Sequence, residues 1–117
     1  MSIEDTWNKL HEKERQLSEK EWDLYQRIKK LDSKKMEVLD QMLNDSHWLN
    51  DLDFLFEGSK YQSQMMNDQL EFQHQVRIME YSLDEELEKL RKEHKSIEMK
   101  LDSIHQEKRR LATEEIT

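Results

Sequence analysis

The chain has 117 residues, of which 39% are charged and 34% hydrophobic, with one glycine, no proline and no cysteine. These numbers exclude disulfides, thiolate metal sites and most compact enzyme folds, whose tight turns need glycine or proline. The formal charge of −8 disfavours a nucleic-acid partner, because phosphate binding depends on concentrated lysine and arginine. Two classes remain, a protein of long helices and a disordered chain.

Residues 3–56 carry a heptad pattern that predicts the first helical arm. Alternate steps of four and three residues, counted from Ile3, meet mostly apolar side chains. This repeat puts one narrow stripe on a helix, as in a coiled coil, so disorder is the weaker interpretation. The stripe consists of Ile3, Trp7, Leu10, Leu17, Leu24, Ile28, Leu31, Val38, Met42, Leu49, Leu52 and Phe56.

Residues 57–60 are the predicted turn. Gly58 is the only residue of the chain that takes a left-handed conformation without penalty, and it fits the position just past a helix end. Ser59, followed three residues later by Gln62, fits a capping box that opens the next helix. A competing break lies in the Asn-Asp-Ser run at 44–46, where three poor helix formers occur together. The stripe continues in register beyond this run, which favours the turn at Gly58.

A second apolar stripe predicts another helical arm over residues 61–113. Its spacing departs from the heptad between Met79, Leu83 and Leu87, where two steps of four follow each other and relax the supercoil locally. The stripe consists of Met65, Phe72, Val76, Met79, Leu83, Leu87, Leu90, Ile97, Leu101, Ile104 and Leu111.

Two matched arms around one turn predict an all-α fold, a single domain over residues 1–117 built as an antiparallel two-helix hairpin of coiled-coil arms. Residue i would lie near residue 116 − i. This register places Glu21 near His94 and Lys35 near Glu80, so that opposite charges meet across the hairpin at some cost in stability.

Apolar side chains outside the main stripes predict that the hairpin binds a partner and completes a helical bundle with it. A two-helix hairpin of this size buries little core by itself. Large aromatic and methionine side chains beside the stripe are typical of a second helix-packing surface, although they also shield the flanks of a hairpin in some proteins. The predicted partner contacts are Trp22, Tyr25, Met36, Leu39, Leu43, Trp48, Leu55, Met66, Leu70, Ile78 and Tyr81.

The sequence offers no catalytic, cofactor-binding or metal-binding constellation, so we expect no enzyme and no cofactor. The most tempting pattern is Glu71 with His74, accompanied by Asp102 with His105, in the Glu-x-x-His spacing of di-iron bundles. Both pairs would lie far apart on one helix and could not share an ion within one hairpin. We interpret His94, on the stripe, as an interhelical residue and not as a ligand.

The turn carries a family resemblance. Phe56-Glu57-Gly58 is an aromatic-x-Gly tripeptide at the predicted turn, and the chain resembles the WXG-type helical-hairpin proteins of bacterial type VII secretion, which have Trp-x-Gly there. Tyr81 and Glu85 have the spacing of that family's secretion motif, Tyr-x-x-x-Asp/Glu. Phe56 replaces the family's tryptophan, and Tyr81 lies in mid-helix instead of near the C-terminus.

The departures make the chain more similar to the small helical proteins encoded beside LXG-type toxins. This resemblance implies a chaperone-like targeting factor that binds the toxin's helical N-terminal domain, and it leaves open a second small helical protein as a further partner. A homodimer in isolation is compatible with it, and the alternative function is a self-assembling coiled-coil scaffold. With no apolar stretch long enough for a signal peptide or membrane span, we expect a cytoplasmic protein without membrane insertion. The resemblance leaves open whether it is exported with its partner by a route that needs no signal peptide.

Overall fold

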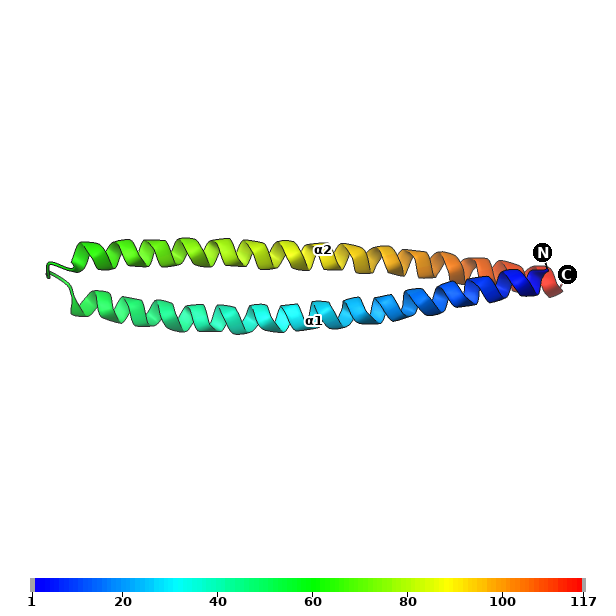
Figure 1. The fold of residues 1–117 in the computed structure, drawn as a ribbon, viewed down its shortest axis with the longest axis horizontal. Coiled ribbons are helices and arrows are strands. Elements are labelled where there is room, and N and C mark those ends of the chain that lie inside the picture. Colours follow the sequence, from blue (N-terminus) through cyan, green and yellow to red (C-terminus); the bar gives the residue numbers. More distant parts are fainter. Residues whose placement is uncertain (1, 117) are drawn as a thin grey trace. The chain divides into compact units, whose positions relative to one another are not determined.

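The computed structural model describes residues 2–116, and the side chains of residues 2–114. It contains two helices, α1 (Ile3–Leu55) and α2 (Gln62–Ile116), which run in opposite directions (Figure 1). No strand occurs in the described residues. The predicted all-α antiparallel hairpin is therefore confirmed, whereas its completion by a partner stays a prediction. The ends of the predicted domain, residues 1 and 117, lie outside the described residues.

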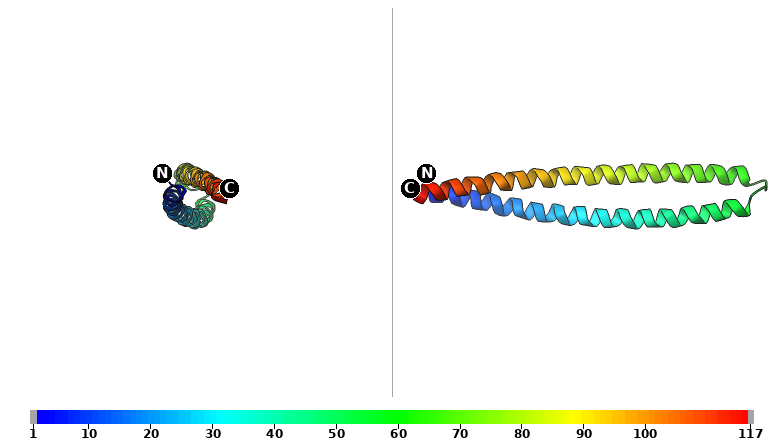
Figure 2. Two further views of the ribbon diagram at one scale, coloured as in Figure 1. Left: turned by 90° about the vertical axis from the view of Figure 1, so that its right-hand side faces the viewer. Right: turned by 180° about the vertical axis from the view of Figure 1, so that it is seen from behind.

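Contacts within the chain gather into two compact units. We call Met1–Lys29 with Glu88–Thr117 the terminal unit, and Lys30–Leu87 the turn unit. In each unit a segment of α1 lies beside an antiparallel segment of α2, as the views in Figures 1 and 2 agree. The turn unit also contains the loop between the helices.

The loop between the helices contains Gly58, as predicted. Gly58 has a φ of 77°, and its N–H donates a hydrogen bond to Oε1 of Gln62 over 3.1 Å. The hydroxyl of Ser59 accepts from the N–H of Tyr61 at 3.2 Å. The predicted capping box is thus wrong in detail. It required Ser59 and Gln62 to bond to each other's N–H, whereas the Gln62 side chain bonds to Gly58 and the Ser59 side chain to Tyr61, and α2 begins at Gln62 itself. The competing break at 44–46 lies inside α1.

The predicted stripe of α1 faces the partner helix in both units. Leu24 is buried, and every other predicted stripe residue from Leu10 to Phe56 is half-buried. Ile3 and Trp7, in the first turns, are each 38% exposed. Trp7 nevertheless has a cross-helix neighbour, because the ammonium of Lys108 lies 4.7 Å from the centre of its ring.

The stripe of α2 is confirmed except at one residue. Met79 is exposed, while Glu80 beside it is half-buried and continues the row from Val76 to Leu83. The double step of four therefore lies at Phe72, Val76 and Glu80, seven residues earlier than predicted. The contact between the two stripes is polar here, since the half-buried Lys35 of α1 forms an ion pair with Asp84 of α2.

The register differs from the prediction by about one helical turn. In the turn unit Lys35 pairs with Asp84 and not with Glu80, and Gln69 donates to Asn50 over 3.2 Å. In the terminal unit His105 contacts Glu14 at 3.2 Å. Residue i thus lies opposite about 119 − i within each unit, instead of 116 − i. The predicted contact of Glu21 with His94 is present, and Glu98 joins it.

Candidate protein-binding surfaces

Burial is distributed unevenly between the two units. Among its described side chains, the terminal unit contains six that are apolar and buried, which are Leu24, Leu90, Ile97, Leu101, Ile104 and Leu111. In the turn unit Leu87 is the only described side chain that is buried, and the remaining stripe residues keep part of their surface in solvent. The turn unit therefore has an incomplete core of its own.

The structure exposes nearly all the residues predicted to contact a partner. Leu55 and Tyr81 are 74% and 70% exposed, whereas Leu39 is the exception and is half-buried. Trp22 and Tyr25 belong to the terminal unit, where their rings stack with centres 6.2 Å apart. The exposed members in the turn unit are Met36, Leu43, Trp48, Leu55, Met66, Leu70, Ile78 and Tyr81. Their role in binding stays a prediction.

An apolar groove of about 350 Å³ runs along the turn unit. Leu39, Met42 and Leu43 line it from α1, and Phe72 and Val76 line it from α2. Polar side chains at its rim are those of Ser46, Gln73, Arg77 and Glu80. Apolar side chains bounded by a polar rim are the usual construction of a site that accepts another protein's apolar residue.

Further exposed apolar side chains were not among the predicted contacts. Phe54 is 76% exposed, and Tyr61 and Met79 are also exposed in the turn unit. The apolar run 54–56 could have predicted the exposure of Phe54. Three consecutive helical residues cannot all face one stripe, so at least one of them must point away from it. Met79 escaped prediction since the heptad placed it on the stripe.

The turn tripeptide lies partly against its neighbours. Phe56 is half-buried and meets the ring of Tyr61 edge to face, with ring centres 6.1 Å apart. Glu57 and Gly58 are exposed. This contact brings together two aromatic side chains from the two ends of the loop, so Phe56 helps to close the turn.

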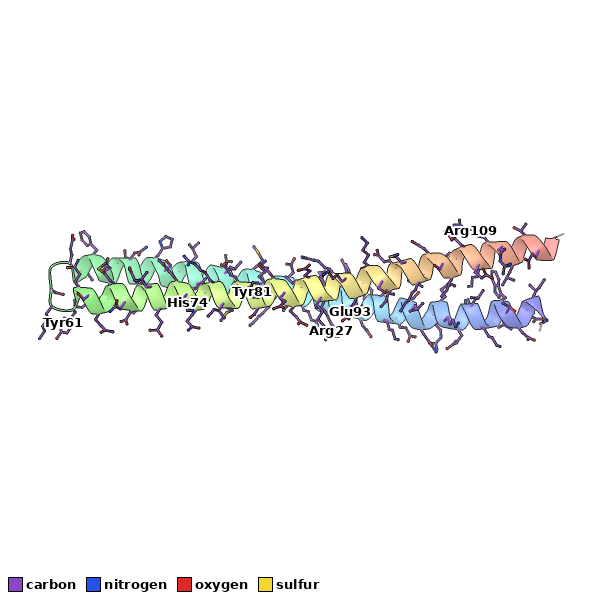
Figure 3. The ribbon with its side chains drawn as sticks, turned by 90° about the horizontal axis from the view of Figure 1, so that it is seen from above. Arg27, Tyr61, His74, Tyr81, Glu93 and Arg109 are labelled. Carbon is purple, nitrogen blue, oxygen red and sulfur yellow. The ribbon has the colours of Figure 1, made fainter. Side chains whose placement is uncertain are left out.

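The candidate secretion motif lies on an accessible part of α2. Tyr81 and Glu85 are both exposed, and Figure 3 shows Tyr81 well along α2 from Tyr61 at the turn. Residues four apart share one helix face, so a single partner surface can reach both side chains. Their use as an export signal stays a prediction.

The terminal unit contains polar contacts between its helices. The carboxylate of Glu14 on α1 lies 3.2 Å from the imidazole of His105 and 3.3 Å from the ammonium of Lys108 on α2. Nδ1 of His11 lies 3.1 Å from the same ammonium. Glu21, His94 and Glu98 form a second group. The tempting pair Glu71 and His74 lies in the turn unit with both side chains exposed.

Shifted pKa values occur where arginines lie one turn away on the same helix. A hydrogen bond from Arg15 lowers the pKa of Glu12, and one from Arg110 lowers the pKa of Glu107. Each carboxylate pairs with an arginine along a single helix, where Glu12 is exposed and Glu107 half-buried. They are therefore typical helix-stabilising surface pairs.

Comparisons with known proteins add no support to the resemblance. No protein-family model matches the chain, and neither the curated proteins nor the solved structures yielded a match. Neither described helix contains an apolar stretch sufficient to cross a bilayer. The resemblance to WXG-type and LXG-associated proteins accordingly depends on the hairpin and on the turn tripeptide 56–58.

Proposed function

We propose that the protein is a non-enzymatic helical adaptor, a chaperone-like targeting factor that binds the helical N-terminal domain of an LXG-type toxin for type VII secretion. The observation that supports this proposal is the turn unit, which exposes large apolar side chains on both helices beside a half-buried seam. The named class of partner comes from the sequence resemblance. The protein would act in the cytoplasm and leave with its partner without a signal peptide.

A helical partner suits the spacing of the exposed side chains. Met36, Leu39 and Leu43 lie three and four residues apart, and Met66 and Leu70 lie four apart, so each set occupies one helix face. The groove between the helices accepts a row of side chains from a third amphipathic helix. Such a helix would complete the core that the turn unit lacks.

The available apolar surface is large enough for a stable complex. Burial of a leucine, methionine or aromatic side chain contributes about 1.5 to 3 kcal/mol. Six such side chains contribute on the order of 10 kcal/mol before the loss of rotational and translational freedom. The exposed side chains of the turn unit exceed that number.

Co-purification with the N-terminal domain of an LXG-type toxin tests the proposal. The variant combines Leu39→Glu with Leu43→Glu, which puts two charges on the groove. A matched control combines Ser33→Glu with Asn44→Glu, because both residues are exposed on the same helix and outside the groove. We expect the wild type and the control to form a stoichiometric complex, and the groove variant to lose it.

Circular dichroism of the same variants separates binding from folding. The helical signal of the groove variant should stay close to that of the wild type, since Leu43 is exposed and Leu39 only half-buried. Binding by the groove variant equal to that of the control would contradict the proposal. Loss of helix in the groove variant alone would mean that these leucines belong to an internal core.

A self-assembling coiled-coil scaffold is the second candidate. The same incomplete core favours it, because the turn unit of a second copy has matching apolar surface. Light scattering coupled to size exclusion distinguishes the two functions. A tight homodimer whose melting temperature is unaffected by the toxin domain supports the scaffold, whereas a loosely associated chain that the toxin domain stabilises supports the adaptor.

A further inference from the structure

Three potential metal ligands from two helices meet in the terminal unit. Glu21 comes from α1, and His94 and Glu98 come from α2. One ligand atom of each side chain lies within 4.8 Å of the other two. Nδ1 of His94 and Oε1 of Glu98 are already 3.2 Å apart.

The local fold explains why these side chains meet. His94 and Glu98 are four residues apart, so they share one face of α2. Glu21 is a polar residue on the α1 stripe, and the observed register puts it opposite this face. Glu21 and His94 are half-buried between the helices, which restricts the conformations of both side chains.

The charges around the group favour a cation. Among the described residues no lysine or arginine forms an ion pair with Glu21 or Glu98, although the two carboxylates face each other. A groove of about 350 Å³ adjoins them. One of its carboxylates, Glu14, already has His105 and Lys108 beside it, so the uncompensated charge is that of Glu21 and Glu98. The groove is lined by Glu14, Ser18, Glu21, Glu98, Leu101, Asp102 and His105. Carboxylates held together in this way repel one another unless a positive charge lies between them.

We propose that Glu21, His94 and Glu98 bind one zinc ion, with water completing its coordination from the groove. Imidazole with carboxylates is a ligand set that suits zinc, and metal–ligand distances of about 2.0 to 2.2 Å put neighbouring donors roughly 3.3 Å apart in a tetrahedron. The pair of His94 and Glu98 has this spacing, and a ligand atom of Glu21 lies within 4.8 Å of both. The ion would link α1 to α2 and fix which residues of the two helices lie opposite each other in the terminal unit.

Titration calorimetry of the full chain with zinc chloride tests the site. We expect one ion per chain and a zinc-dependent rise in melting temperature. Glu21→Gln and His94→Gln should each weaken the affinity by at least about tenfold, since even the loss of an outer-shell partner has effects of that size. His74→Gln is the matched control, because His74 is an exposed histidine of α2 outside the group, and it should bind as the wild type does.

Cobalt in place of zinc reports the coordination itself. A visible absorption band of tetrahedral strength should appear with the wild type and His74→Gln, and disappear with His94→Gln. The Gln variants keep the size of their side chains, and a helical signal equal to that of the wild type confirms that they fold. Light scattering should show the same mass with and without zinc, because all three ligands belong to one chain.

Four results would overturn the proposal. They are no binding at 100-fold excess of zinc over protein, unchanged affinity in Glu21→Gln, loss of affinity in His74→Gln, and a zinc-dependent increase in mass. The site is independent of the toxin partner, so Glu21→Gln should leave the co-purification of the toxin domain intact.

Discussion

Gly58 is the residue on which the turn depends. Its φ of 77° belongs to the left-handed region, where a side chain costs about 1 to 2 kcal/mol in most residues. A Cβ added to Gly58 would meet no atom within 4 Å. The restriction is therefore one of backbone conformation and not of space.

Substitution of Gly58 should separate these two causes. We expect Gly58→Val to lower the free energy of unfolding by about 1 to 2 kcal/mol, because a β-branched residue resists the left-handed conformation. Gly58→Asn should lower it by less, since asparagine tolerates that conformation. Chemical denaturation followed by circular dichroism gives both values. Equal losses in the two variants would mean that steric space limits the turn after all.

The element α2 has two faces with very different environments. Leu87 is 1% exposed on the face toward α1, whereas Leu70 is 64% exposed. Both are leucines inside the same helix, so helix propensity affects them equally. Burial alone distinguishes them.

Truncation of each leucine measures this difference. Leu87→Ala should lower the free energy of unfolding by about 2 to 5 kcal/mol, because it removes transfer energy and leaves a cavity. Leu70→Ala should change it by no more than about 0.5 kcal/mol in the free protein. Denaturant titrations of both variants provide the comparison. If Leu70→Ala were as harmful, α2 would bury its other face in the free protein, against the proposed adaptor.

Buried and exposed apolar side chains are distributed unevenly between the two units. Most buried side chains lie in the terminal unit, and most exposed large apolar side chains lie in the turn unit. Few buried contacts favour local opening of a segment. A protein with one well-packed unit and one incomplete unit is suited to capturing a partner with the second.

Hydrogen exchange should reveal this division. In the free protein we expect the amides of Lys30–Leu87 to exchange faster than those of the terminal unit. Addition of the toxin domain should slow exchange mainly in the turn unit, because in the proposed complex the partner would complete the core of that unit. Mass spectrometry of peptides from both units makes the comparison. Protection confined to the terminal unit would place the binding surface there, on the side of Trp22 and Tyr25.

The sequence by itself determined the helices, the stripe of α1 and the turn. Heptad spacing is a local property of a helix, so Leu10 to Phe56 could be assigned to the seam before any contact was known. A single glycine in a chain without proline left one good position for reversal. The exposure of most flanking apolar residues followed as well, since the heptad turns them away from the other helix, but Leu39 is half-buried.

Only the tertiary structure decided how one helix slides against the other. Loop length and side-chain contacts set that register, and neither has a periodic signal in the sequence. The pairing of Lys35 with Asp84 instead of Glu80 depends on it. So does the meeting of Glu21 with Glu98 as well as His94. A one-turn shift moves every cross-helix neighbour, because it changes which side chains lie opposite without changing which face they occupy.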